Sequence, residues 1–392
     1  MDLNLSPEYE AFRDEVRGFL AANADKAPRP GLGGDAKAWQ KLLIETGYAA
    51  RTIPAEYGGH GARPDILKSR IIAEEFARAR VSQGMGGQGI SMLVPTLLEM
   101  GTEDQKRQFI APTLAGEMLW CQGYSEPEAG SDLAALKTRA VLDGDEWVIN
   151  GQKIWTSTAQ HAHWMFCLVR TEPEAKKHEG ISFLLFSMQT PGIEVRPLVD
   201  MTGAANFNEV FFTDVRVPAG QIVGRRGEGW KVANSILKHE RGSLADPNQM
   251  QARLNGLIEL MKAEMLDGRR LVDDPVMRDR LVAIQARVHA ARCHDLRLLS
   301  LSVRGAQAGI SSLVVKLQGT ELRHELEGFA VDVMGELGLL YGDTPRLRGG
   351  GSWQRDYMYF LGLIIGGGTS QIQKNIISEV GLGLPREPKP AA

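Results

Sequence analysis

Cysteine is scarce in this chain of 392 residues, which contains three: Cys121, Cys167 and Cys293. Three widely spaced thiols are too few for a disulfide framework or a zinc site, so we expect core thiols in a reducing cytoplasm. No apolar run approaches the ~18 residues that a membrane-spanning helix needs, and residues 1–7 lack the basic and apolar regions of an export signal. We therefore expect a cytoplasmic protein that does not enter a membrane.

An excess of charge of either sign is also lacking. The 45 Lys and Arg residues nearly balance the 48 Asp and Glu residues, for a formal net charge of -3 at pH 7. Such a balance creates no strong field toward nucleic acid or a membrane surface, so we expect neither as a partner. A phosphate-bearing substrate would need a local basic site. The length allows two or three domains.

The periodicity of apolar residues divides the chain into three regions. Residues 1–118 show helical spacing, beginning with a helix start at Ser6. Residues 119–222 show alternating, β-branched segments separated by Pro and Gly, which predicts an antiparallel β domain. Residues 223–392 return to long amphipathic helices, the last one expected over residues 353–381. The expected fold class is α+β: an N-terminal helical domain, a middle β domain and a C-terminal four-helix bundle.

Two segments of the middle region carry the main functional signal. Residues 120–132 (WCQGYSEPEAGSD) form a polar turn whose N–H groups and hydroxyls could hold an anionic or heterocyclic ligand. Residues 149–157 (INGQKIWTS) combine an Asn-Gly hairpin signal with a strand that would place Trp155 and Ser157 on one face. An indole and a hydroxyl on one side of a strand suit a flat ring with a polar edge.

These segments resemble the acyl-CoA dehydrogenase family of flavoproteins, in which T/S-E-P-x-A-G-S-D and K-x-W-x-T/S segments clasp the flavin of FAD. The resemblance extends to PAEYGG at residues 54–59, EVFFTDVRVP at 209–218 and GTSQIQ at 368–373, so it covers nearly the whole chain. It implies bound FAD, an acyl-CoA substrate and oxidation to the trans-2-enoyl-CoA, with an electron-transfer flavoprotein as acceptor. It also implies an enzyme of lipid degradation that forms a tetramer.

The resemblance assigns binding residues by position. Four residues would contact the flavin: Gln122, Ser125, Trp155 and Ser157. Thr369 and Gln371 would hold the adenosine diphosphate part of FAD, at the start of a helix whose free N–H groups favour phosphate. Ser131 would lie at the mouth of the CoA channel.

The catalytic base needs a separate search, because many members of the family carry it in a Tyr-Glu-Gly-Thr segment where this chain has Gly367. A minority pattern places the glutamate on an earlier helix, immediately before an arginine, and that place holds Glu240 and Arg241. We expect Glu240 to remove the α-proton and Arg241 to line the active-site end of the CoA channel. The alternative is a solvated charged helix face. Gly366 and Gly367 would leave room for a branched, cyclic or otherwise bulky acyl group.

Two departures from the family pattern concern the phosphates of FAD. The Arg-x-x-Phe-Gly segment that grips FAD across a subunit boundary reads GRRLVDD at residues 268–274, and Asp332 replaces a glutamine that helps hold the pyrophosphate. The departures favour a heterotetramer with a homologous chain as much as a homotetramer. Two other functions stay open: a non-catalytic or half-site subunit, and a relative that uses the flavin with oxygen to oxidise nitroalkanes or to hydroxylate.

Overall fold

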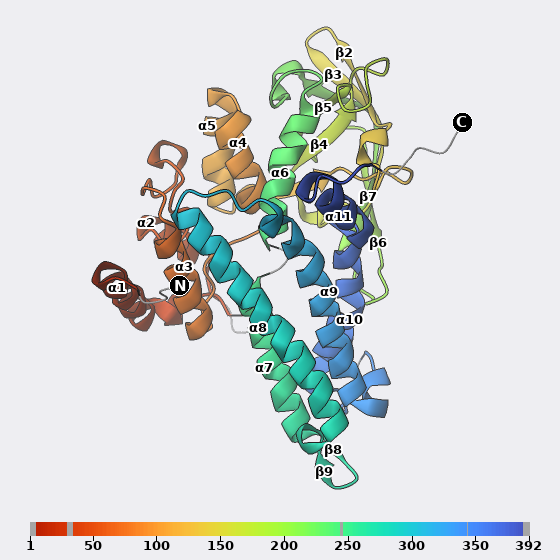
Figure 1. Cartoon of the computed structure of the whole chain (residues 1–392). Helices are drawn as coiled ribbons and strands as arrows, with labels where there is room; N and C mark the ends of the chain where they lie inside the picture. The colour runs from red at the N-terminus through yellow and green to blue at the C-terminus, as the bar shows by residue number, and fades with distance from the viewer. Residues whose placement is uncertain (1–4, 30–33, 244–245, 343, 387–392) are drawn as a thin grey trace. The chain divides into compact units, whose positions relative to one another are not determined.

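The computed structural model describes residues 5–29, 34–243, 246–342 and 344–386, without the side chains of residues 238–243 and 266. The chain consists of two compact units, Met1–His239 and Glu240–Ala392, coloured red to green and green to blue in Figure 1. Among the described helices, none combines the length and the apolar character that crossing a membrane requires.

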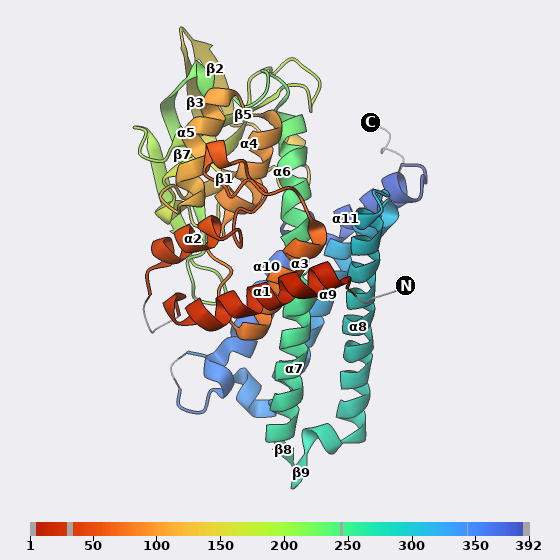
Figure 2. The same ribbon diagram turned by 90° about the vertical axis from the view of Figure 1, so that its left-hand side faces the viewer.

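Helices form the N-terminal part of the first unit: α1 (Pro7–Asn23), α2 (Ala36–Glu45), α3 (Ile66–Ala79), α4 (Val94–Met100) and α5 (Glu103–Leu114). Helix α1 begins with Pro7 after Ser6, as predicted, and α5 begins with a capping box between Thr102 and Gln105. Helices α1 and α3 lie side by side (Figure 2) and bury Trp39 and Phe76 in a shared core with α2.

A seven-stranded sheet follows: β1 (Trp120–Gly123), β2 (Arg139–Asp143), β3 (Glu146–Lys153), β4 (Trp164–Arg170), β5 (Ile181–Ser187), β6 (Ile193–Leu198) and β7 (Phe207–Pro218). The strand order is β1-β4-β2-β3-β7-β6, with β5 beside β4. Most pairs are antiparallel, but β1 runs parallel to β4. The sheet shares a core with α4, α5 and α6 (Gly229–Ser243), and Phe109, Phe166 and Ile236 meet there.

The Asn150-Gly151 pair lies inside strand β3, so the prediction of a hairpin turn there is wrong. The register between β3 and β7 shifts between Ile149 and Gly151, which marks a β-bulge. Gly151 takes φ +147°, and a side chain at this position would come within 2.7 Å of Thr138. The turn of the β2–β3 hairpin is at Gly144, with φ +63°, where the Asp143-Gly144-Asp145 signal predicts it.

The second unit is the expected helical bundle: α7 (Pro247–Ala263), α8 (Pro275–Val303), α9 (Ile310–Val333), α10 (Ser352–Ile365) and α11 (Ser370–Ile376). A short hairpin of β8 (Met265–Leu266) and β9 (Arg269–Arg270) connects α7 to α8. Leu257, Ile284 and Phe329 represent its core. The fully buried carboxylate of Glu327 accepts hydrogen bonds from Arg253 and Arg323, which compensate its burial.

The last predicted helix, over residues 353–381, is wrong in one respect, because the structure breaks it. Helix α10 ends at Ile365 and α11 begins at Ser370. Between them Gly367 and Gly368 take φ +65° and φ +96°, a left-handed conformation that glycine adopts readily. Three glycines in a row therefore interrupt the helical pattern at the point that carries the family's usual base.

The three cysteines do not share one environment. Cys121 and Cys167 are buried in the core of the sheet, where burial raises the pKa of the Cys121 thiol and raises that of Cys167 to about 12. Cys293 is exposed on α8, so the expectation of a core thiol is wrong for this residue. The sequence places Cys293 in a long helix, but it did not show whether the residue lies on the exposed or the buried face of that helix.

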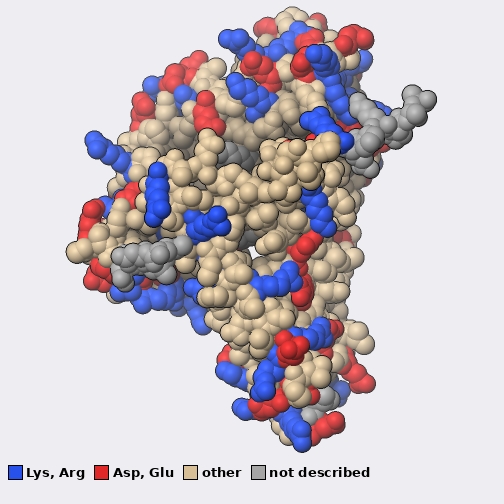
Figure 3. All heavy atoms as spheres, in the orientation of Figure 1, with Lys and Arg blue, Asp and Glu red and all other residues tan. Residues whose placement is uncertain are grey.

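Charged side chains of both signs are interspersed on the face shown in Figure 3. Blue and red groups alternate over the lower end of the bundle and over the upper end of the sheet. A ligand that carries phosphate therefore meets a mixed field on this face and needs individual cationic partners for its anionic groups.

Candidate active site

The structure brings the two motif segments together inside the first unit. The backbone N–H of Ile154 donates to the carbonyl oxygen of Ser125 at 2.9 Å, and the ammonium of Lys153 donates to the carbonyl oxygen of Tyr124 at 3.1 Å. These bonds join the end of β3 to the turn after β1. Residues that are about 30 positions apart in sequence thus form one local surface.

A buried ion pair fixes this junction. The side chain of Lys153 is 0% exposed and that of Glu126 7%, and their nitrogen and oxygen atoms are 2.8 Å apart. The same carboxylate accepts the backbone N–H groups of Lys137 at 2.6 Å and Thr138 at 2.9 Å, so both of its oxygen atoms are satisfied. Sequence reasoning quoted both motifs but missed this pair. The available signal was that one segment carries acidic residues, Glu126 among them, and the other a single lysine.

Acid is expected to weaken this junction. Burial raises the pKa of Glu126, but the charge of Lys153 and the donated hydrogen bonds outweigh burial and hold the pKa below its usual value of 4.5. A lowered pKa in the folded state stabilises the fold fully above pH 4.5, and this stability is lost as pH falls through the folded-state pKa.

A pH series tests this expectation with the wild type and Glu126→Gln. At neutral pH the variant should have the lower melting temperature, because it leaves the Lys153 ammonium buried without its anion. The gap between the two proteins should narrow below pH 4.5 as the wild-type carboxylate takes up a proton. A gap that stays constant from neutral pH into acid would contradict the role of the ion pair.

Trp155 lies just beyond the end of β3, which stops at Lys153. The prediction that Trp155 and Ser157 share a strand face is therefore wrong. Trp155 takes φ +61°, a left-handed conformation that costs a residue with a side chain about 1–3 kcal/mol. The residue is 59% exposed. Among the ring contacts of the described residues, its indole makes one, a T-shaped contact with Phe207 at 6.1 Å between ring centroids. An exposed indole on a strained backbone offers a flat surface to a ligand.

The other expected flavin contacts lie in the same unit and are half-buried. Gln122 is on β1, where its side-chain oxygen accepts a hydrogen bond from Gln88 at 3.5 Å. Ser125 follows in the turn, and Ser157 follows Trp155. The chemistry of this donor set fits the flavin end of FAD, because three polar side chains accompany an exposed aromatic face. The contacts themselves stay a proposal.

The turn that carries Ser131 is exposed and rich in paired charges. Asp132 pairs with Lys177, and Glu128, which stands where the family often has glycine, pairs with Lys137. Ser131 itself is exposed. Exposed ion pairs of this kind contribute little to stability, so either lysine can exchange its partner for an anionic ligand at small cost.

In the second unit, Thr369 caps helix α11. Its hydroxyl accepts the backbone N–H of Ile372 at 3.2 Å, and Gln371 is exposed in the first turn. The preceding glycine turn is fixed by Lys316 of α9, which is 2% exposed and donates to the carbonyl oxygens of Ile364 at 2.9 Å and Gly368 at 2.6 Å. Sequence reasoning missed Lys316, a lone cation on the apolar side of a helix.

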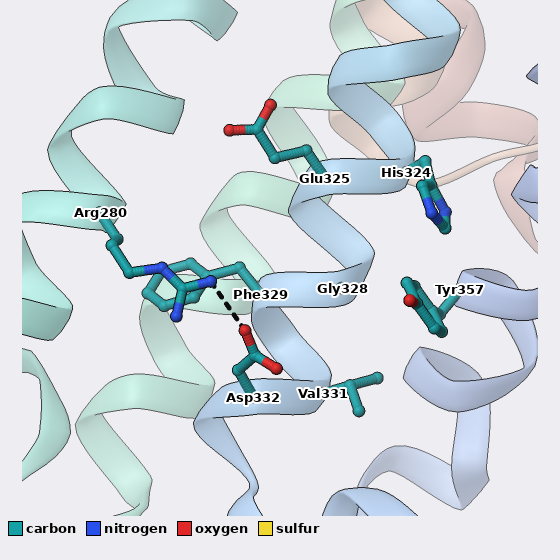
Figure 4. A pocket seen from close by; sticks show the side chains of 8 residues that line it. All are labelled: Arg280, His324, Glu325, Gly328, Phe329, Val331, Asp332 and Tyr357. Atoms are coloured by element: carbon teal, nitrogen blue, oxygen red, sulfur yellow. Dashed lines mark hydrogen bonds and ion pairs between the residues drawn. The ribbon is translucent and has the colours of Figure 1, made fainter.

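A cavity of about 280 Å³ lies between α8, α9 and α10 within the second unit (Figure 4), and its lining consists of Arg280, His324, Glu325, Gly328, Phe329, Val331, Asp332 and Tyr357. The rings of His324 and Tyr357 stack at 4.7 Å. The carboxylate of Asp332 pairs with Arg280 at 2.7 Å, as the dashed line in Figure 4 shows.

The residues that depart from the family pattern do not fit a phosphate grip. Asp332 brings a negative charge and occupies Arg280. Arg270 on β9 is held by Asp273 at 2.8 Å, so it too has a carboxylate partner. This chain therefore supplies side chains that suit the flavin end of FAD. The residues expected to hold the phosphates across a subunit boundary suit them less well.

Glu240 and Arg241 belong to helix α6. Their side chains lie outside the described part of the structure, so the roles of base and channel residue stay predictions. The helix itself is the element on which the minority pattern of the resembled family places its glutamate.

Comparison with known proteins covers nearly the whole chain. Three family models match: "Acyl-CoA dehydrogenase, N-terminal domain" at residues 6–117, "middle domain" at 121–215 and "C-terminal domain" at 227–382. Acyl-CoA dehydrogenase IpdE1 of Mycobacterium tuberculosis is 39% identical over 397 aligned positions, which cover 97% of this chain and 99% of that protein.

Two solved structures have the same fold over nearly their full length. The ChsE4-ChsE5 complex from Mycobacterium tuberculosis matches with a TM-score of 0.82 and 32% identity, and covers 99% of this chain and 100% of that one. The structure titled "Tcur3481-Tcur3483 steroid ACAD" matches with a TM-score of 0.82 and 29% identity at the same coverage. The expected fold class and the resemblance are thus confirmed, and the chain is an oxidoreductase that belongs to the acyl-CoA dehydrogenase family.

Proposed function

We propose that this chain, with FAD bound, carries out the α,β-dehydrogenation of an acyl-CoA whose acyl group is bulky and contains fused rings. We base this on the joined motif segments, where an exposed indole in a strained conformation stands beside half-buried polar side chains. The family membership supports the reaction class. The acyl group and the cofactor are the proposed parts.

Each residue has a distinct task in this reaction. Bound FAD supplies the acceptor for the hydride that leaves the β-carbon of the acyl chain. Glu240 takes the α-proton, so the carbon chain loses one proton and one hydride and gains a double bond. Trp155 would cover the flavin ring of bound FAD, and Gln122 and Ser125 would hold the polar edge of that ring. Reducing equivalents then pass to an electron-transfer flavoprotein, as the family resemblance implies.

Two observations support a bulky acyl group. Gly366 and Gly367 carry no side chain at the place of the family's usual base, so neither adds bulk there. One similar structure carries the word steroid in its title, "Tcur3481-Tcur3483 steroid ACAD". The left-handed Gly367 and Gly368 also have a backbone reason to be glycine, so space alone does not account for all three positions.

A second candidate function is that of one half of a mixed assembly. Asp332 and Asp273 place carboxylates beside Arg280 and Arg270, and these negative charges oppose a phosphate of a neighbour's cofactor. The ChsE4-ChsE5 complex is, by its title, an assembly of two different chains. We propose a heterotetramer in which this chain supplies the flavin surface and a homologous chain supplies the missing phosphate contacts.

An acyl-CoA panel tests the proposed function. The chain is purified alone and together with a homologous chain from the same source, and bleaching of the flavin is followed anaerobically with straight-chain, branched and fused-ring acyl-CoAs. We expect bleaching with the fused-ring substrates and little with straight chains. Bleaching only in the presence of the second chain would support the half-site function, and oxidation of nitroalkanes without any response to CoA thioesters would contradict both.

A further inference from the structure

The segment that carries Trp155 is held in place by one buried side chain on β7. Asn208 is 0% exposed. Its amide nitrogen donates to the carbonyl oxygen of Thr156 at 2.9 Å, and its own backbone carbonyl oxygen accepts the N–H of Thr156 at 3.0 Å. Residue 156 is therefore fixed at both its N–H and its C=O by a single residue.

The bonds continue along the segment on the C-terminal side of the indole. The amide nitrogen of Asn208 also donates to the side-chain oxygen of Gln160 at 2.5 Å. The N–H of Thr158 donates to the carbonyl oxygen of Asn206 at 3.0 Å. Thr158 has φ +56°, so Trp155 and Thr158 are both left-handed. Hydrogen bonds to residues 206 and 208, at the start of β7, hold the backbone at or beside each of them.

Left-handed residues with side chains persist only where their surroundings hold them. Trp155 has no strand pairing of its own, because β3 ends two residues earlier. Packing holds it only weakly, because the residue is 59% exposed and its ring contact is with the edge of Phe207. The bond from the N–H of Ile154 to Ser125 holds the N-terminal side of Trp155, and the bonds from Asn208 to Thr156 hold its C-terminal side, where the chain leaves the strand.

The residue type is consistent with this task. Asparagine is disfavoured inside strands, and Asn208 stands in a strand that otherwise follows an alternating apolar pattern. Burial of an amide costs free energy unless hydrogen bonds compensate it. Here the donor is shared by two acceptors of the indole-bearing segment.

We propose that Asn208 is a positioning residue, which holds the strained backbone after Trp155 and so orients the indole against the flat ring of the bound cofactor. This inference rests on the proposed function, because it takes Trp155 as the ring-stacking residue. Asn208 is fully buried, so its side chain offers no surface to the cofactor. Its effect on cofactor binding must therefore pass through Trp155.

A double-substitution cycle tests that route with apo chain and added FAD. Asn208→Ala should raise the Kd for FAD about tenfold, since a buried hydrogen bond and the orientation of the indole are both lost. In a Trp155→Ala background the same substitution should raise the Kd less than about twofold, because there is no indole left to orient. Asn23→Ala is the control, because this asparagine at the end of α1 donates its amide to the carbonyl oxygen of Phe19 at 3.0 Å, outside the segments of the site, and the Kd should stay unchanged.

Intrinsic fluorescence gives a readout that needs no cofactor. The difference in emission anisotropy between each protein and its Trp155→Phe counterpart isolates this indole, and Asn208→Ala should lower it. If Asn208→Ala does not fold, Asn208→Ser carries the same comparison. Equal losses of FAD affinity with and without Trp155, or unchanged anisotropy, would overturn the inference. Absence of FAD binding in the wild type with the expected anisotropy change would instead overturn the proposed function alone.

Discussion

Replacing Glu240 with glutamine is expected to lower kcat about 10²–10⁴-fold, the usual contribution of a general base. The amide keeps the size of the side chain but cannot take up the α-proton. FAD should stay bound, because the expected flavin contacts lie on other elements. Steady-state turnover with the best acyl-CoA of the panel and an artificial electron acceptor measures the effect, and the visible spectrum of the protein measures bound flavin.

Glu259 provides the matched control for this substitution. It lies on the exposed face of helix α7, where it pairs with Lys262 at 2.7 Å. Glu259→Gln should leave kcat unchanged, since an exposed ion pair contributes little. Full activity of Glu240→Gln would assign the proton acceptor to another group. Loss of both colour and activity would make Glu240 a structural residue rather than a base.

Replacing Lys153 with methionine is expected to destabilise the folded chain by about 3–5 kcal/mol, the typical effect of breaking a buried ion pair from one side. The carboxylate of Glu126 would remain buried with its backbone donors but without a cation. The carbonyl oxygen of Tyr124 would also lose a donor. Both motif segments lose their connection, so FAD affinity should fall as well. Denaturant unfolding followed by circular dichroism measures the loss.

Lys137 is the control for that measurement. Its ammonium pairs with Glu128, and both side chains are 75% exposed. Lys137→Met should leave the free energy of unfolding close to the wild-type value, because solvent screens an exposed pair. Equal changes in the free energy of unfolding for the two substitutions would show that the Lys153–Glu126 pair does not stabilise the fold more than an exposed pair does.

Much of the fold could be predicted because local rules and packing agree there. Ser6 and Pro7 predict the start of α1, and Gly144 marks a true hairpin. The period of apolar residues separates helices from strands without knowledge of any contact. Predictions became wrong where one local signal had two structural meanings. Asn150-Gly151 is a turn signal in sequence, but in the sheet it forms a bulge against Thr138.

The candidate site was predictable in its members but not in its geometry. The family motifs named Trp155 and Ser157, whereas alternation along a strand gave them a shared face that the structure does not have. Lys153, Glu126 and Asn208 act through partners far away in sequence, and single-residue patterns carry no information on such pairs. Burial against a specific partner had to be seen in the structure.

Uptake of deuterium at the α-carbon tests the proposed chemistry most directly. The substrate is a fused-ring acyl-CoA whose β-carbon carries no hydrogen, so hydride cannot leave and only proton removal is observed. In deuterated water the wild type with bound FAD should exchange the α-hydrogen, and Glu240→Gln should do so at the rate seen without protein. Equal exchange by both proteins, or none by the wild type, would contradict a Glu240 carboxylate that takes the α-proton.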